Sequence, residues 1–111
     1  KTFTVANMNQ FSEGDCKSFN IQTANGIQSG FIVMWQERYY AYVNQCPHTG
    51  VNLEWRADQF LDSTNQYIQC GTHGARFRIS DGYCVYGPCQ GQSLKPLEIA
   101  LDNGKILIIF E

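Results

Sequence analysis

Two short segments of the chain each place one cysteine and one histidine close together and end in glycine. Residues 46–50 read Cys-Pro-His-Thr-Gly, and residues 70–74 read Cys-Gly-Thr-His-Gly. These two boxes contain both histidines of the 111-residue chain. Thiolates and imidazoles are ligands that zinc and iron accept readily in proteins. The pattern predicts a metal site whose ligands are Cys46, His48, Cys70 and His73.

Length and composition fit one globular domain over residues 1–111. Hydrophobic residues make up 43% of the chain and charged residues 16%, an ordinary balance for a folded domain. The net charge is −2 and no cluster of Lys or Arg occurs, which argues against nucleic acid and anionic membranes as partners. The longest apolar runs, at 31–35 and 106–110, are too short to span a bilayer. We expect no membrane span and no nucleic-acid partner.

The cysteines favour metal binding in a reducing compartment. The chain has five, whereas a secreted disulfide framework normally has an even number. No signal peptide is visible, although the chain begins at Lys1 and a processed start stays open. We therefore expect a cytoplasmic protein. Cys84 and Cys89 could pair with each other but are expected to stay reduced, and Cys16 is expected to be incidental.

Short runs rich in β-branched and aromatic residues dominate the rest of the chain. No segment keeps helical periodicity over three turns, although residues 51–62 could hold a short helical turn. We expect an all-β barrel or sandwich. The expected strands are Thr2–Ala6, Phe31–Trp35, Arg38–Val43, Tyr67–Gln69, Ala75–Ile79, Pro96–Leu101 and Lys105–Phe110. The expected turns are Asn25-Gly26, Ser29-Gly30, Asp81-Gly82, Gly87-Pro88 and Asn103-Gly104.

Three interpretations of the two boxes compete. The cysteines and histidines could be unrelated, but two such pairs that use both histidines argue against chance. A structural zinc site is the second interpretation, although zinc sites more often place their two cysteines together and their two histidines together. The third is a [2Fe–2S] cluster in which one iron takes both thiolates and the other takes both imidazoles. We favour the third, because each box then gives one ligand to each iron.

From about Phe31 to its C-terminus the chain resembles a Rieske-type iron–sulfur domain. The likeness lies in CPHTG and CGTHG, in Phe77 after the second box, in the turn DGYCVYGP and in the closing LKPLEIALDNGKILIIF. It implies stacked antiparallel sheets with a small inserted cluster-binding subdomain, here at about residues 46–80. It also implies one [2Fe–2S] cluster per chain. Cys46 and Cys70 would hold its buried iron, and His48 and His73 its outer iron.

The resemblance also gives expectations for residues around the boxes. The turn Gly87-Pro88 resembles the proline loop that covers a Rieske cluster from a third side, although an ordinary β-turn fits the sequence equally well. Respiratory Rieske proteins brace their boxes with a disulfide, and the corresponding positions here are Val51 and Thr72, so that brace is absent. Three glycines are expected to let the backbone approach the metal and adopt positive φ angles: Gly50, Gly71 and Gly74.

Two positions next to the expected cluster predict a low reduction potential. Rieske ligation gives potentials of about −150 to +300 mV, because neutral imidazoles replace two thiolates. High-potential Rieske centres resemble one another in having a serine hydroxyl that donates to a sulfide and a tyrosine hydroxyl that donates to a cysteine sulfur. The corresponding positions here are Ala75 and Phe77, which have no hydroxyl. We expect a potential near about −150 mV and electron transfer near neutral pH without proton uptake.

The resemblance implies a one-electron carrier, not an enzyme. We expect a monomeric ferredoxin that passes electrons from a flavin-dependent reductase to a terminal oxygenase or other redox enzyme. Docking would use the histidine tip, with Val51, Leu53 and Pro88 as an apolar rim, although Val51 and Leu53 could equally pack inward. One alternative is a small subunit, or the domain through which electrons enter a larger oxidoreductase. Another is a structural zinc-binding interaction module.

Overall fold

The computed structural model describes residues 2–47, 52–54, 58–71 and 74–110. Within these ranges the chain forms β-strands and no α-helix, which confirms the expected all-β class. No helix of this described part could cross a membrane. The strands are β1 (Thr2–Asn7), β2 (Cys16–Thr23), β3 (Gly26–Trp35), β4 (Arg38–Val43), β5 (Tyr67–Gln69), β6 (Arg76–Arg78), β7 (Cys84–Tyr86), β8 (Glu98–Asp102) and β9 (Lys105–Ile109), and a single 3₁₀ turn, η1 (Met8–Gln10), follows β1.

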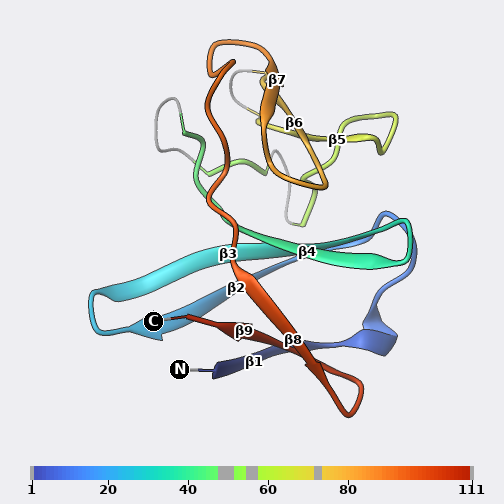
Figure 1. Cartoon of the computed structure of the whole chain (residues 1–111), viewed down its shortest axis with the longest axis vertical. Coiled ribbons are helices and arrows are strands. Elements are labelled where there is room, and N and C mark those ends of the chain that lie inside the picture. Colours follow the sequence, from blue (N-terminus) through green and yellow to red (C-terminus); the bar gives the residue numbers. More distant parts are fainter. Residues whose placement is uncertain (1, 48–51, 55–57, 72–73, 111) are drawn as a thin grey trace.

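The strands form three antiparallel sheets, as the Rieske-type arrangement implies. Their orders are β1-β9-β8, β2-β3-β4 and β5-β6-β7. The first two sheets form a base, and the third stands above it (Figure 1). The third sheet belongs to a long excursion of the chain between β4 and β8, which we call the upper region (residues 44–95). Both boxes therefore lie in one excursion that starts and ends on the base.

Strand β3 separates two hydrophobic cores, because successive side chains of a strand point to opposite faces. Ile32 packs in the lower core, with buried residues of β1, β2, β4 and β9. Phe31 and Val33 pack in the upper core, with buried residues of the upper region. Both faces of β3 are thus covered, which explains why its second half reads as a continuous apolar run.

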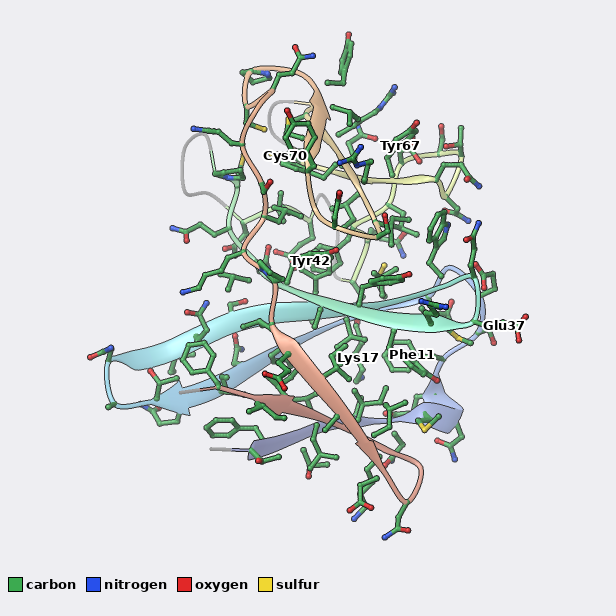
Figure 2. The ribbon with its side chains drawn as sticks, in the orientation of Figure 1. Phe11, Lys17, Glu37, Tyr42, Tyr67 and Cys70 are labelled. Carbon is green, nitrogen blue, oxygen red and sulfur yellow. The ribbon has the colours of Figure 1, made fainter. Side chains whose placement is uncertain are left out.

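Aromatic side chains connect the base to the upper region. The rings of Phe31 and Phe60 stack with their centroids 4.1 Å apart and their planes at 8°. The hydroxyl of Tyr42 donates a hydrogen bond of 2.5 Å to the carbonyl of Ile79. Figure 2 shows Tyr42 where β4 meets the upper region, well above Phe11 in the base. These contacts fix how the excursion stands on β3 and β4.

The structure corrects the expected strands in two places. β2 and β7 were not expected, because β2 alternates largely polar residues with only Ile21 buried and β7 is three residues long. The expected turn at Ser29-Gly30 is wrong, since both residues lie inside β3. Gly30 is needed there for close packing: a Cβ at this position would lie 2.6 Å from Cζ of Phe19.

The expected helical turn is only partly described. Residues 52–54 and 58–62 are not helical, and the rest of that segment lies outside the described residues. The turn at Asn103-Gly104 is confirmed, since it joins β8 to β9 with Asp102 paired to Lys105. Asn25-Gly26 is confirmed in the same way between β2 and β3.

Candidate metal centre

Two fully buried thiols, one from each box, lie in the same core. Cys46 follows β4 and Cys70 follows β5, and both have 0% exposure in the upper core. Figure 2 shows Cys70 high in the upper region, beside β7. His48, His73 and Gly50 lie outside the described residues. The two thiols of the expected ligand set therefore share one buried core, and no group of three or more metal-ligating side chains occurs in the described part of the chain.

Backbone hydrogen bonds hold the second box in a tight turn. The Gly74 N–H donates to the Cys70 carbonyl (2.9 Å), and the Cys70 N–H donates to the Ala75 carbonyl (2.8 Å). Gly74 has a φ of +68°, the positive angle expected for it. The Gly71 N–H donates to the Leu53 carbonyl at 2.8 Å. The turn around Cys70 is thus tied directly to the segment that follows the first box.

A buried asparagine fastens the first box at its two ends. Asn44, 5% exposed, accepts a hydrogen bond from the Leu53 N–H (2.8 Å) and donates one to the Glu54 carboxylate (2.9 Å). Leu53 is fully buried, so it packs inward and does not form an exposed rim. Sequence reasoning missed Asn44, whose only signal is a polar residue directly after an apolar strand.

Ala75 and Phe77 lie beside the second box with 0% exposure. Neither side chain carries a hydrogen-bond donor, so these two positions give the surrounding core only apolar atoms. The loop after β7 packs against Ala75. Gly87 has a φ of +101°, and a Cβ on it would lie 2.8 Å from the Cα of Ala75. Pro88, next along this loop, is exposed.

Two more thiols occupy the same core. The sulfur atoms of Cys84 and Cys89 lie 3.0 Å apart, and both side chains are buried. Burial, and then its contact with Cys84, raises the pKa of the Cys89 thiol to about 12, with smaller contributions from nearby Cys46. Cys89 is therefore a neutral thiol at pH 7.

The fifth thiol belongs to another part of the core. Cys16, at the start of β2, packs against the upper core, and burial raises its pKa to about 12. The expectation that Cys16 is incidental is wrong in one respect, because its side chain contributes to packing. Besides burial, the groups that influence the pKa of Cys16 are Phe60, Asp15 and Asp58, and none of them belongs to either box.

A buried carboxylate organises the approach to β5. Asp62 accepts hydrogen bonds from the Thr64 hydroxyl (2.8 Å) and from the N–H groups of Gln66 (3.2 Å) and Tyr67 (3.3 Å). Burial alone would raise the pKa of Asp62, but these hydrogen bonds outweigh it and hold the pKa below its usual value. Asp62 also lies 3.8 Å from the Arg76 guanidinium. Sequence reasoning missed this residue as well.

The donor chemistry fits a thiolate-bound metal centre. Cys46 and Cys70 supply soft sulfur donors in an apolar core, the environment that iron–sulfur clusters and zinc accept. Asp62 is already occupied by its hydrogen bonds and is not needed as a ligand. Two sulfur donors from two loops, each loop also carrying one histidine in the sequence, match the arrangement that a Rieske cluster requires.

Comparison with known families identifies the domain. Residues 1–104 match the family model of the Rieske [2Fe-2S] domain. The chain belongs to the Rieske [2Fe–2S] domain family. A [2Fe–2S] cluster is the cofactor that membership in this family implies, and the match favours the iron–sulfur interpretation of the boxes over zinc.

Solved Rieske proteins share the fold at low sequence identity. The ferredoxin of carbazole 1,9a-dioxygenase from Nocardioides aromaticivorans IC177 is 21% identical with a TM-score of 0.76, and the match covers 97% of this chain and 96% of that one. A chain in a complex of reduced oxygenase and oxidized ferredoxin of carbazole 1,9a-dioxygenase is 17% identical with a TM-score of 0.73, over 96% of this chain and 91% of that one.

One similar structure is a much longer chain. In the reduced complex between oxygenase and ferredoxin of carbazole 1,9a-dioxygenase, the matched chain is 20% identical with a TM-score of 0.79. The match covers 96% of this chain but only 27% of that one. A search of curated proteins finds no match. The Rieske fold is thus shared both with a chain of similar length and with part of a longer one.

Proposed function

We propose that this protein is a Rieske-type ferredoxin, a one-electron carrier that passes electrons from a flavin-dependent reductase to a terminal oxygenase. The observation that carries the proposal is the burial of Cys46 and Cys70 in one core of a Rieske domain. The nearly complete mutual coverage with a dioxygenase ferredoxin supports the ferredoxin role. The complexes of oxygenase with ferredoxin among the similar structures support an oxygenase as electron acceptor.

The proposed ligands are the four side chains of the two boxes. Cys46 and Cys70 hold the inner iron, which their full burial supports. His48 and His73 hold the outer iron and form the end that meets the partners. One cluster is held per chain, and residues 1–111 act as one monomeric domain in the cytoplasm. When bound, the cluster accepts and releases one electron, while the protein keeps water away from its sulfur ligands.

The proposed potential lies at the low end of the Rieske range. Ala75 and Phe77 are fully buried and offer no hydroxyl to a cluster sulfur, which supports a value near about −150 mV. Protein-film voltammetry at pH 7 measures it directly. A midpoint above roughly +100 mV would contradict this part of the proposal.

The cofactor and its ligands can be tested on the purified protein. We expect a red-brown protein with two irons and two sulfides per chain and a reduced-state EPR spectrum of the Rieske type. Cys46→Ser and Cys70→Ser should abolish the visible absorbance, whereas Cys16→Ser should keep it. A colourless protein that contains zinc would overturn the proposal and favour a zinc-binding interaction module.

The role as a carrier needs a separate test. A flavin-dependent reductase supplied with NADH should reduce the cluster, and the reduced protein should pass its electron to cytochrome c, used as a convenient acceptor. The alternative role, a domain or small subunit of a larger oxidoreductase, is supported by the match to part of a longer chain. Gel filtration of the protein expressed with its neighbouring genes separates the two: a stable larger complex favours the alternative.

A further inference from the structure

Two thiols of the upper core have no place among the proposed cluster ligands. Cys84 begins β7, and Cys89 lies in the loop that follows this strand. Their side chains are 0% and 1% exposed, and their sulfur atoms are 3.0 Å apart. A disulfide has an S–S length of about 2.0 Å, so an approach of about 1 Å would join them.

The backbone around the pair is already closed. The Cys84 N–H donates to the Gln92 carbonyl at 2.8 Å, and the Gln92 N–H donates to the Cys89 carbonyl at 2.9 Å. Within the loop, the Gln90 N–H donates to the Gly87 carbonyl at 3.2 Å. These bonds hold the two cysteines opposite each other before any covalent bond forms, so closing a disulfide requires little further ordering of the chain.

We propose that Cys84 and Cys89 form a reversible disulfide that staples the loop after β7. The oxidant is a small-molecule disulfide such as oxidised glutathione. When the loop after β7 opens, one of the two thiols loses its proton and attacks the small disulfide, which gives a mixed disulfide and releases one small thiol. The second cysteine then attacks the mixed disulfide and releases the other small thiol. Two protein thiols become one disulfide, and the two electrons and two protons end on the two small thiols.

The stapled loop lies directly beside the proposed centre. Gly87 packs against Ala75, the residue that follows the second box. Cys89 lies close enough to Cys46 for the two thiols to interact. A disulfide between Cys84 and Cys89 would therefore fix the loop that covers this side of the proposed centre. It would act across one loop of the upper region, unlike a bond that joins the two boxes to each other.

Mass spectrometry of the holoprotein tests the bond. The protein is equilibrated in buffers of reduced and oxidised glutathione, quenched in acid, denatured, alkylated and cut with trypsin. The fragment that begins at Ile79 carries both Cys84 and Cys89 and no other cysteine. We expect it to lose two hydrogen atoms and to take up no alkyl group in oxidised glutathione, and to take up two alkyl groups again in excess reduced glutathione.

Three results of this measurement would overturn the proposal. They are full alkylation of both cysteines at every glutathione ratio, a disulfide that joins Cys89 to Cys46, and a stable mixed disulfide with glutathione. Cys16→Ser is the matched control and should oxidise like the unaltered protein, while Cys84→Ser and Cys89→Ser should not form the bond. The measurement does not depend on electron transfer, so it can fail or succeed independently of the proposed function.

The effect on the pocket has its own readout. Decay of the visible absorbance in excess chelator reports how fast the cluster is lost. We expect the oxidised form to lose its cluster several-fold more slowly than the reduced form. The double variant Cys84→Ala/Cys89→Ala should decay at one rate, whatever the glutathione ratio. Equal rates for the two forms of the unaltered protein would refute the stapling role, even if the disulfide forms.

Discussion

The base and the upper region differ in the length of their strands and in the composition of their cores. The base has strands of five to ten residues around a lower core of aliphatic and aromatic side chains. The described strands of the upper region are three residues long. Its core contains four cysteines, whereas the lower core contains none. Short ladders contribute few hydrogen bonds, so the upper region depends on its core, its loop ties and, in our proposal, its cluster.

The largest expected difference between the two regions should follow the removal of a proposed ligand. We expect Cys70→Ser to abolish the visible absorbance completely. Hydrogen exchange should then speed up in residues 58–71 and 74–92, while β2 and β3 keep their protection, because the base has its own core. Cys16→Ser is the control and should keep the visible absorbance. If Cys70→Ser kept the cluster, or if both regions lost protection together, the upper region would not depend on its metal centre.

Cutting the aromatic contact between the regions should cost the next largest amount. Phe31→Ala removes a fully buried ring that stacks on Phe60 and should destabilise the protein by about 3–5 kcal/mol. Chemical denaturation measures the change. Ile32→Val is the comparison on the other face of β3 and should cost only about 1 kcal/mol. Equal losses for the two variants would show that the stack contributes no more than a methyl group of the lower core.

A hydroxyl added beside the second box should alter the centre without altering the base. Phe77→Tyr offers a donor to a cysteine sulfur and should raise the midpoint potential by roughly 40 mV, the equivalent of one hydrogen bond of about 1 kcal/mol. Voltammetry at pH 7 measures the shift. Phe3→Tyr, in β1, is the control and should leave the potential unchanged. An unchanged or lower potential for Phe77→Tyr would argue that this position does not face a cluster sulfur.

The smallest expected effect is the pH dependence that Asp62 gives to the upper region. Its pKa is lower in the folded protein than in the unfolded chain, so its contribution is present above about pH 4 and is lost as pH falls through the folded pKa. Asp62→Asn should cost about 1 kcal/mol at pH 7, and the difference from the unaltered protein should shrink below about pH 4. Denaturation between pH 3 and 7 measures it. A difference that stayed constant down to pH 3 would contradict this expectation.

The sequence revealed most about the parts whose signal is local. Two boxes with thiols and imidazoles at short spacing predicted a metal site, and runs rich in β-branched and aromatic residues predicted β4 and β5 with their observed bounds. β2 escaped notice because its exposed side chains are polar, and its place is set by pairing with β3. Gly30 resembled a turn residue, but the aromatic ring of Phe19 packed over it explains the glycine.

The hydrogen bonds that support the site could not be predicted from the sequence. Asn44 forms hydrogen bonds with Leu53 and Glu54 only after the chain has folded. The same holds for the three hydrogen bonds that Asp62 accepts from residues that follow it in the chain. The sequence alone does not distinguish a buried asparagine from one in an exposed loop. The difference is visible only in the folded structure. The sequence left open whether Cys84 and Cys89 pair, and in the structure their sulfur atoms lie 3.0 Å apart.

The pairing of β1 with β9 has a practical consequence for the attachment of this protein to a surface. Thr2 is paired with Ile109, so both ends of the described chain lie at the same end of the β1–β9 pair. Figure 1 places both ends at the foot of the molecule, and Figure 2 places Cys70 near its top. An affinity tag or a linker to an electrode, attached at either end, would hold the molecules by the base, with the upper region directed into solution.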